Sequence, residues 1–496
     1  MTLGGLPLRL MARDSESALA AANSDHVLVV IQLEGGNDGL NMVVPVEDAE
    51  YYTLRPALAV AKNEALVLDA EPLLRLHPTM GGVQRHFNEG RLAIVENIGY
   101  PRQTGSHFSG TEIWNTASPG ATTQSLGTGW LGRWLHRDLP GYPDTLPHHP
   151  PAIEIGATSS SLFSIPGGTI AMSIADPEEF YTLVNGGPNV ADGAAPDTPA
   201  GREWAYIDGV NRQARAYADA VRDASRRAQN QAVYPEGNPL AAQLAIVARL
   251  VAGGLETKVY KCTLGGFDTH GDQLRRHPEL LGWLSSAISA FQDDLLALGV
   301  ADRVVGMTYS EFGRRVFDNG NGTDHGTAAP HFVFGGRIGG GVVHGGVPDI
   351  AGRDHTGNLL HRITFQCFYA SILAPHFGLD EAAIAQILPV NVCDVGGRLP
   401  LYRAVSVERA RDAVPLAVAP NPVRNGVAHV VLPFSIGPTF RWHLVDVGGR
   451  EVAGGVGERS GGSFVLSCRN IAGGRYLLEI EGERGAGGCA EIVVVQ

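Results

Sequence analysis

Three apolar stretches of this chain each end abruptly in a cluster of glycines and charged residues, and this repeated pattern constrains the fold more than any other feature. The stretches are Leu28–Leu33, Lys258–Leu264 and Val304–Tyr309. Nearly continuous runs of Val, Ile and Leu are typical of the central strands of parallel sheets, which are buried on both faces. The carboxyl ends of such strands border the crevice in which α/β proteins bind ligands. We therefore expect the polar clusters to meet at one edge of a sheet.

Six side chains in these clusters carry acid–base or metal-binding chemistry. They offer only carboxylate oxygens and imidazole nitrogens, which suit Zn²⁺, Mn²⁺, Mg²⁺ or Ca²⁺. One or two such ions could polarise an ester and lower the pKa of a bound hydroxyl group. Any single acid–histidine pair could be an ordinary hydrogen-bonded pair in a loop, but three strand ends together favour one site. The six residues are Asp38, Asp268, His270, Glu311, Asp324 and His325.

A serine follows a fourth apolar stretch, Leu92–Ile98, in the same way. Ser106 lies at the start of a predicted helix that runs through Trp114. Its hydroxyl would cap the helix there, which is the simpler interpretation. Free backbone N–H groups at the same helix end also favour an anion. Ser106 is therefore a candidate nucleophile for a negatively charged ester.

Strands and helices alternate along most of the chain, which predicts an α/β fold with a mostly parallel sheet covered by helices on both faces. From Pro420 onward, short alternating strands and glycine-rich turns instead predict a small all-β sandwich. We expect one domain over residues 26–404 and a second over residues 414–496. Helices are expected over Met80–Glu89, Gly129–Leu139, Glu203–Gln231, Leu240–Ala252, Leu280–Leu298 and Leu359–Phe377.

Charge and hydropathy argue against several classes of partner. The net charge is −13, without a run of Lys or Arg, so neither nucleic acid nor an anionic membrane surface is expected to bind. No apolar run is long enough to span a bilayer. Residues 1–25 are rich in small and apolar residues and contain arginine. They are either the remnant of an export signal or a loose N-terminus.

The five cysteines show no CxxC spacing, which predicts neither a disulfide framework nor a thiolate zinc site. Cys367 lies in a predicted apolar helix and is expected to be a buried structural thiol. The sequence leaves open whether Cys468 and Cys489 form a pair.

Taken in order, the motifs resemble those of a known family. Gly35–Asn41, Ser106–Phe108, Gly266–His270, Ser310–Arg314 and Gly322–Pro330 are similar to the DUF1501 family, an uncharacterised bacterial family of the alkaline phosphatase/sulfatase superfamily that is often exported by the twin-arginine route. The resemblance covers roughly residues 25–389. It implies an alkaline phosphatase-like fold, two metal ions and a Ser, Thr or formylglycine nucleophile.

Residue by residue, the resemblance implies that Ser106 is the nucleophile. Asp38 takes the position of the metal-binding Asp after the first strand. Asp268, His270 and His325 are similar to the ligands of one metal site.

The second metal site of the superfamily is matched less completely. Glu311 takes the position of a strand-end Asp ligand, but Phe312 stands where the following His ligand is expected. Without that imidazole the second site would offer oxygen ligands alone, which favours Mg²⁺, Ca²⁺ or Mn²⁺, or leaves the site empty. Asp324, His107 and Arg314 are expected to contact the ligands rather than the metal.

The C-terminal residues resemble a second known module. Ala419–Pro422, Leu444–Val452 and Ile471–Tyr476 are similar to a C-terminal sorting domain of the type IX secretion system. This resemblance implies the secretion machinery as a partner and a periplasmic, cell-surface or extracellular location. A carbohydrate-binding or immunoglobulin-like sandwich is the alternative, but no aromatic cluster in the sequence accompanies it.

Three functions are compatible with these residues. The first is an exported metal-dependent hydrolase of phosphate or sulfate esters, in small molecules or polysaccharides, with Ser106 as nucleophile. The second, suggested by Phe312, is a non-catalytic surface-binding protein that keeps a metal for stability. The third is a metal-free hydrolase that pairs Ser106 with a distant His and Asp, because the adjacent His107 is poorly placed to act as its base. The substrate, the metal and the oligomeric state are left open.

Overall fold

The computed structural model divides into two compact units, Asp25–Tyr402 and a second that combines Met1–Ser24 with Arg403–Gln496. Most of residues 1–25, predicted as a remnant of an export signal, lie outside the described residues. The structure describes residues 2–3, 6–7, 25–120, 126–156, 159–186, 198–388, 393, 397–403, 414–424, 426–432, 439–446, 451–459, 463–469, 471, 474–482 and 487–494.

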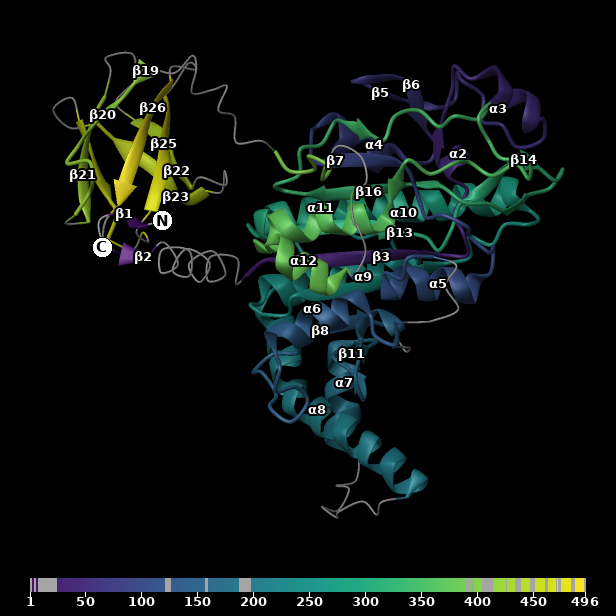
Figure 1. The fold of residues 1–496 in the computed structure, drawn as a ribbon, viewed down its shortest axis with the longest axis horizontal. Helices are drawn as coiled ribbons and strands as arrows, with labels where there is room; N and C mark the ends of the chain where they lie inside the picture. The colour runs from purple at the N-terminus through teal and green to yellow at the C-terminus, as the bar shows by residue number, and fades with distance from the viewer. Residues whose placement is uncertain are drawn as a thin grey trace. The chain divides into compact units, whose positions relative to one another are not determined.

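The first unit is built around a nine-stranded sheet with β3 (Val27–Glu34) near its middle (Figure 1). β12 (Val259–Gly265) and β13 (Val304–Tyr309) flank β3, and both run parallel to it. β16 (Ala329–Gly335) runs antiparallel to its neighbours β13 and β7 (Leu92–Gly99). The strand order is β11-β8-β12-β3-β13-β16-β7-β17, and β18 also pairs with β7. The prediction of a mostly parallel sheet is therefore confirmed.

The remaining strands of this sheet and three small two- or three-stranded sheets complete the first unit's β-structure. They are β8 (Ala152–Ile155), β11 (Ala171–Ile174), β17 (Val343–His344), β18 (Ile363–Thr364), β4 (Val43–Val44), β5 (Leu66–Leu68), β6 (Glu71–Leu76), β9 (Ser164–Ile165), β10 (Gly168–Thr169), β14 (Arg314–Asp318) and β15 (Thr323–His325). The small sheets are β4-β6-β5, β9-β10 and β14-β15.

Helices lie on both faces of the large sheet (Figure 1). None among the described residues is long and apolar enough to cross a membrane. The helices are α2 (Gly39–Met42), α3 (Ala49–Leu54), α4 (Gly81–Asn88), α5 (His107–Thr116), α6 (Trp130–Asp138), α7 (Pro177–Gly186), α8 (Pro199–Arg227), α9 (Pro239–Ala252), α10 (Gln273–Ala297), α11 (Phe365–Phe377) and α12 (Glu381–Ile387), with short 3-10 turns at Ser161–Phe163 and Ala301–Arg303.

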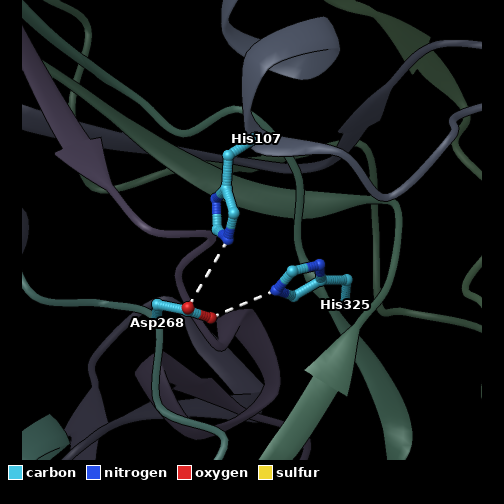
Figure 2. A group of neighbouring side chains, drawn as sticks. All are labelled: His107, Asp268 and His325. Atoms are coloured by element: carbon cyan, nitrogen blue, oxygen red, sulfur yellow. Dashed lines mark hydrogen bonds and ion pairs between the residues drawn. The ribbon is translucent and has the colours of Figure 1, made fainter.

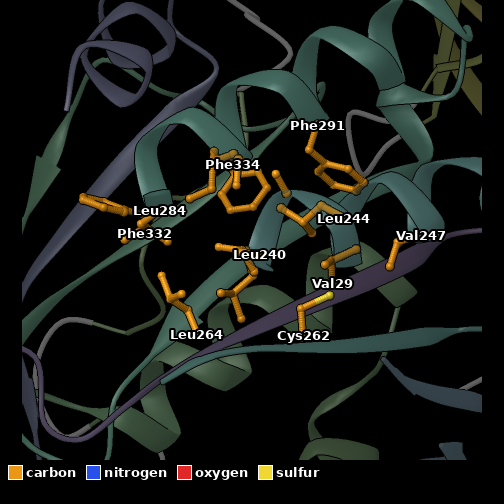
Figure 3. Packing of buried hydrophobic residues seen from close by; sticks show 14 of the residues in the cluster. Val29, Leu240, Leu244, Val247, Cys262, Leu264, Leu284, Phe291, Phe332 and Phe334 are labelled. Atoms are coloured by element: carbon orange, nitrogen blue, oxygen red, sulfur yellow. The ribbon is translucent and has the colours of Figure 1, made fainter. Parts of the chain in front are cut away.

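Two apolar cores form because successive residues of β3 face opposite sides of the sheet. Val29 packs in the core beneath α4, α9 and α10, part of which Figure 3 shows. Val30 packs in the other core, beneath α5, α6, α11 and α12. Burying a Val, Leu or Ile side chain contributes about 1.5–3 kcal/mol. This is why the strand is apolar from Val27 to Ile31 and again at Leu33, and the rigid sheet that results fixes the loops at its edge.

Helix α11 begins later than the sequence predicts. The predicted helix started at Leu359, but residues 363–364 pair with β7 as β18 before the helix starts at Phe365. The hydroxyl of Thr364 accepts a hydrogen bond from the backbone N–H of Cys367, which caps the helix. Apolar composition alone cannot separate a short buried strand from the helix that follows it.

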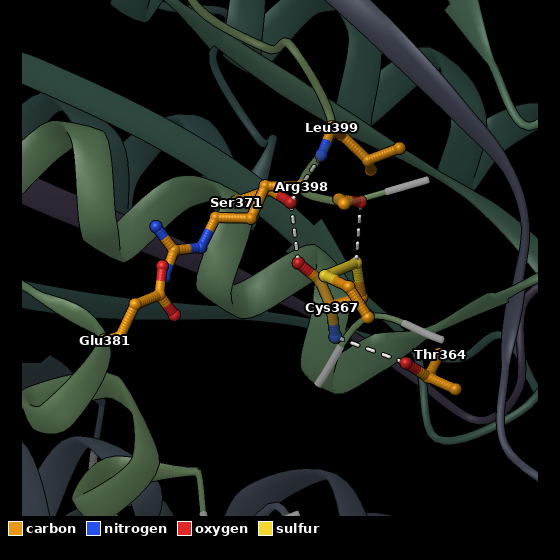
Figure 4. The surroundings of a disulfide bond; sticks show 8 residues. Thr364, Cys367, Ser371, Glu381, Arg398 and Leu399 are labelled. Carbon is orange, nitrogen blue, oxygen red and sulfur yellow. Dashed lines mark hydrogen bonds and ion pairs between the residues drawn. A yellow bond between two sulfur atoms is a disulfide. The ribbon is translucent and has the colours of Figure 1, made fainter. Parts of the chain in front are cut away.

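The expectation that Cys367 is a free thiol is wrong. Cys367 in α11 forms a disulfide with Cys393, 26 residues further on (Figure 4). Nearby, the backbone N–H of Leu399 donates to the hydroxyl of Ser371, which holds the following segment against the same helix. The pairing depends on how the chain returns to α11, and no local spacing signals it. Two further cysteines, Cys262 and Cys468, are free thiols and are buried.

The C-terminal unit has two facing sheets around one core, as predicted for a small β-sandwich. Its core includes Val430, Leu444 and Leu478, each from a different strand. The strands are β19 (Val414–Pro415), β20 (Ala417–Ala419), β21 (Val427–Val431), β22 (Thr439–Asp446), β23 (Glu451–Glu458), β24 (Ser463–Ser467), β25 (Gly474–Gly482) and β26 (Gly487–Val494), ordered β19-β26-β25-β22-β23 and β20-β21-β24, and the same unit contains the short pair β1 (Thr2–Leu3) and β2 (Leu6–Pro7).

Candidate metal centre

Three loops meet at the carboxyl ends of β3, β12 and β13. Because these strands are parallel neighbours, the loops Gly35–Asp38, Gly266–His270 and Ser310–Gly313 leave the sheet at one edge. Gly35 has a φ of +120°, and a Cβ atom there would lie 2.3 Å from the backbone nitrogen of Asp268. Only glycine therefore allows the first two loops to lie this close together.

A hairpin brings a fourth segment to the same edge. β14 continues from the loop after β13, and β15 returns antiparallel to it. Arg314 at the start of β14 lies opposite His325 at the end of β15. The hairpin thus returns His325 to the strand ends, eleven positions along the chain from Arg314.

One carboxylate and three imidazoles converge at this point, and all four side chains are partly exposed. Oδ1 of Asp268 lies 3.1 Å from Nε2 of His325 and 3.2 Å from Nε2 of His270. Its Oδ2 lies 3.5 Å from Nε2 of His107, the first residue of α5 (Figure 2). The Nε2 atoms of His270 and His325 are 2.8 Å apart. We call these four residues the His–Asp cluster.

The outer nitrogen of each imidazole faces an oxygen atom. Nδ1 of His325 lies 2.7 Å from the backbone oxygen of Gly105, and Nδ1 of His107 lies 2.8 Å from Oε1 of Glu311. Nδ1 of His270 lies 3.2 Å from Oδ1 of Asp324. In the neutral ring the proton therefore belongs on Nδ1, and the lone pair of Nε2 points into the cluster.

This arrangement fits a divalent cation. Lone pairs of Nε2 atoms that face a carboxylate, and one another, repel unless a proton or a cation lies between them. Three imidazole nitrogens with one carboxylate form a donor set that Zn²⁺ and Mn²⁺ accept. An oxygen acceptor behind each ring is also the usual support of a metal-bound histidine.

Arg314 fixes the carboxylate of the His–Asp cluster. Its buried guanidinium lies 2.7 Å from Oδ1 of Asp268. Partial burial alone would raise the pKa of Asp268, but the hydrogen bond from Arg314 and its positive charge help to lower it to about 2. The same guanidinium donates to the backbone oxygens of Gly35, Gly36, Phe267 and Thr323. Arg314 therefore ties the loops together while it keeps Asp268 ionised.

Glu311 lies behind His107 rather than within the His–Asp cluster. It is buried, and its Oε1 accepts hydrogen bonds from the backbone N–H of Gly35 and from Nδ1 of His107. These contacts orient the imidazole of His107. Its role as a metal ligand stays a prediction.

Asp38 is buried and its contacts run away from the cluster. Its Oδ2 forms an ion pair with Arg55 at 2.6 Å and accepts a hydrogen bond from Nε2 of Gln273. Burial alone would raise the pKa of Asp38, but the Arg55 guanidinium holds it below its usual value. No described contact joins Asp38 to the three imidazoles, and its role as a metal ligand also stays a prediction.

Phe312 fills the space next to the His–Asp cluster. The ring is buried, and its centroid lies 5.0 Å from that of His107 and 4.5 Å from that of His325. A Cβ atom on Gly36 would lie 2.3 Å from this ring. The aromatic side chain therefore forms a close-packed wall where the resemblance would place a ligand.

Ser106 is the N-cap of α5, which confirms the simpler of the two interpretations given to it. Its hydroxyl accepts a hydrogen bond from the backbone N–H of Ser109 at 3.5 Å, a long contact. The next residue, His107, belongs to the His–Asp cluster. Ser106 thus lies beside the site in the chain, and its role as nucleophile stays a prediction.

Sequence reasoning placed His107 beside the ligands, whereas the structure groups it with Asp268 and His325 in a set that could hold a metal ion. The motif Ser106–Phe108 contained the signal, since a histidine in the first turn of a helix after a strand faces the same edge. Arg55 and Gln273, which contact Asp38, carried no signal because neither lies in a recognisable motif.

Comparison with solved structures finds remote similarities. The chain is similar to the PsFucS1 sulfatase from a Pseudoalteromonas species, at 10% identity and a TM-score of 0.37 over 91% of this chain and 87% of that chain. It is also similar to a protein in the alkaline phosphatase superfamily from Vibrio parahaemolyticus, at 9% identity and a TM-score of 0.36 over 97% and 91% of the two chains. Identities this low transfer no activity.

Comparison of sequences gives a more specific match. The family described as "Protein of unknown function (DUF1501)" matches residues 207–385, which include Asp268, His270, Glu311 and His325. No curated protein matches the chain.

Proposed function

We propose that this chain is an exported, divalent-metal-dependent hydrolase of phosphate or sulfate esters. The observation that carries the proposal is the convergence of three Nε2 atoms on the carboxylate of Asp268, at the carboxyl ends of parallel strands. His107, His270 and His325 would hold the ion together with Asp268. Three imidazoles favour Zn²⁺ or Mn²⁺ over Mg²⁺ and Ca²⁺, which prefer oxygen ligands.

A bound divalent ion would supply positive charge that polarises the ester and stabilises its leaving oxygen. The chain's own groups would do the rest. The Oγ atom of Ser106 would attack phosphorus or sulfur, and its proton would pass to the leaving oxygen as the bond to that oxygen breaks. Water would then hydrolyse the ester formed on Ser106 and restore its hydroxyl group. The positive end of the α5 helix dipole, at the first turn of the helix, would orient the anionic ester.

Arg314 and Glu311 hold two of the proposed metal ligands in place. Arg314 keeps Asp268 ionised and in place, and Glu311 keeps the proton of His107 on Nδ1. A ring held in this tautomer presents its Nε2 lone pair without rearrangement, which is the kind of preorganisation that a metal site needs.

Export is part of the proposal and rests on separate observations. The Cys367–Cys393 disulfide is typical of proteins that leave the reducing cytoplasm. The β-sandwich of residues 414–496 is proposed as the sorting domain that its motifs resemble. Residues 1–25 are proposed as the remnant of an export signal.

The alternative is a non-catalytic surface protein that the metal stabilises. Phe312 favours it, because this ring stands where a catalytic metal ligand is expected. Under either function, a ligand present at 100 times its Kd stabilises the fold by about 2.7 kcal/mol. Removal of the metal with a chelator should therefore lower the melting temperature in both cases, and only turnover separates them.

The test uses the purified full chain, loaded with Zn²⁺ or Mn²⁺ and assayed on aryl phosphates and aryl sulfates. We expect hydrolysis that a chelator abolishes and that Ser106→Ala removes. Ser109→Ala, which changes a hydroxyl in the same helical turn, is the matched control and should retain turnover. A fully loaded protein that hydrolyses no ester in the panel would favour the non-catalytic alternative.

A further inference from the structure

We propose that this site binds one divalent cation per chain, because a buried arginine and an aromatic ring replace the second metal site that the family resemblance implies. The inference rests on the proposed function only for the presence of a metal. It is carried by the surroundings of Asp38 and Phe312, neither of which takes part in the His–Asp cluster.

The carboxylate of Asp38 already has a cation. Both side chains of the Asp38–Arg55 pair are at most 1% exposed, and Nη1 of Arg55 lies 2.6 Å from Oδ2. The other oxygen of Asp38, Oδ1, has no hydrogen-bond partner among the described residues. Arg55 therefore compensates the charge of Asp38, and Oδ1 alone would offer a second ion one ligand atom.

The guanidinium of Arg55 is held from every side and cannot leave without breaking several bonds. Nη1 also donates to Oδ1 of Asn41, Nε donates to the backbone oxygen of Val316, and Nη2 donates to that of Arg315. A metal ion at Asp38 would have to displace or face this fixed positive charge. The pair is thus built as a permanent ion pair.

Phe312 fills the space in which the resemblance would place a histidine ligand. Its ring packs against His107 and His325 and leaves no room for a Cβ atom on Gly36. An aromatic ring offers no lone pair to a divalent ion. Oδ1 of Asp38 and the carboxylate of Glu311 would then be the acidic ligands for a second ion, and Oε1 of Glu311 already accepts from Gly35 and His107 while its Oε2 lies 3.4 Å from the hydroxyl of Ser310.

The charges of the site also balance with one ion. Three carboxylates, those of Asp268, Glu311 and Asp324, and one guanidinium, that of Arg314, leave two negative charges among the described groups that contact the imidazoles. The Asp38–Arg55 pair adds none. One divalent cation neutralises the site, whereas a second would leave two uncompensated positive charges next to the first ion.

The test is a metal count on the full chain. Protein equilibrated with excess Zn²⁺ and freed of unbound metal by gel filtration is analysed by element-resolved mass spectrometry. We expect one equivalent in the wild type and one in the double variant Asp38→Asn/Arg55→Gln, which exchanges the ion pair for neutral amides. Two equivalents in the wild type, or loss of the metal from the double variant, would overturn the proposal.

A second measurement does not depend on how the variant folds. In wild-type protein loaded with Mn²⁺, electron paramagnetic resonance should show the six-line signal of isolated ions. The spectrum of a spin-coupled pair would refute the single-ion site. Ester turnover is read separately: one ion without turnover removes the proposed function and keeps this inference, turnover with two ions does the reverse, and no bound metal overturns both.

Discussion

Asp38 and Asp268 follow neighbouring parallel strands, but the protein surrounds these two carboxylates in different ways. Asp268 is about half exposed and faces three imidazole lone pairs, whereas Asp38 is fully buried and paired with Arg55. Both carboxylates are paired with a buried arginine, Asp38 with Arg55 and Asp268 with Arg314. Asp268 differs because it is also exposed and faces imidazole nitrogens whose lone pairs a bound cation would compensate. The same residue type is therefore enclosed by the fold at one position and accessible to a ligand at the other.

The largest effect is expected when the buried pair is broken. Arg55→Ala leaves Asp38 buried and uncompensated, and should lower the free energy of unfolding by about 3–5 kcal/mol. Denaturant unfolding measures it. The control is Lys62→Ala, which removes the ion pair with Glu47 at the same 2.6 Å separation but at the surface, where a loss of about 0–1 kcal/mol is expected. Equal losses would show that Asp38 is compensated by another group.

A substitution in the His–Asp cluster should change the affinity for metal rather than the free energy of unfolding. Asp268→Asn removes the carboxylate that faces all three imidazoles and should weaken metal binding by more than about 100-fold. Competition with a chromophoric chelator measures the affinity. Asp272→Asn, in the same loop but paired with Arg275, should leave the affinity unchanged. A similar loss in both variants would contradict the assignment of Asp268.

A smaller effect is expected for the acid that stands between these two cases. Glu311 is buried like Asp38 but contacts an imidazole of the cluster. Glu311→Gln should weaken metal binding by about 10- to 100-fold, because it disturbs the orientation of His107. The partly exposed Asp324, at 3.2 Å from His270, should matter less when changed to Asn. A larger loss of metal affinity in Asp324→Asn than in Glu311→Gln would show that burial of the carboxylate does not decide how strongly it supports a ligand.

The smallest effect is expected for Glu96, a buried acid that contacts neither an arginine nor a candidate metal ligand within the described part of the chain. Its Oε1 has no hydrogen-bond partner among the described residues, and burial raises the pKa of Glu96 to about 8. The folded state therefore holds a proton that the unfolded state releases near pH 4.5. Stability should be full below that pH and fall as the pH rises toward 8, by about 1 kcal/mol between pH 6 and 7.

Thermal melts of the wild type and Glu96→Gln across pH 5–8 measure this difference. The neutral amide removes the titrating group, so the variant should lose less stability than the wild type as the pH rises. Parallel curves would mean that Glu96 is paired or hydrated in solution.

Much of the architecture could be predicted because it follows from local pattern. β13 starts and ends at the predicted residues Val304 and Tyr309, since a strand buried on both faces is built largely from apolar residues. The predicted start of α11 is wrong because Ile363 and Thr364 cannot be told from the helix that follows them by composition alone. Local composition does not record which neighbour a segment pairs with.

What the sequence by itself determined is the set of apolar strands and the polar loops that end them, and hence the edge at which Asp268, His270, Glu311 and His325 meet. Only the tertiary structure decided which acid is paired by Arg55, which by Arg314, and which cysteine closes a bridge with Cys367. The physical reason is distance along the chain. Alternating polarity acts between neighbouring residues, whereas ion pairs and disulfides join segments that become neighbours only after the sheet has formed.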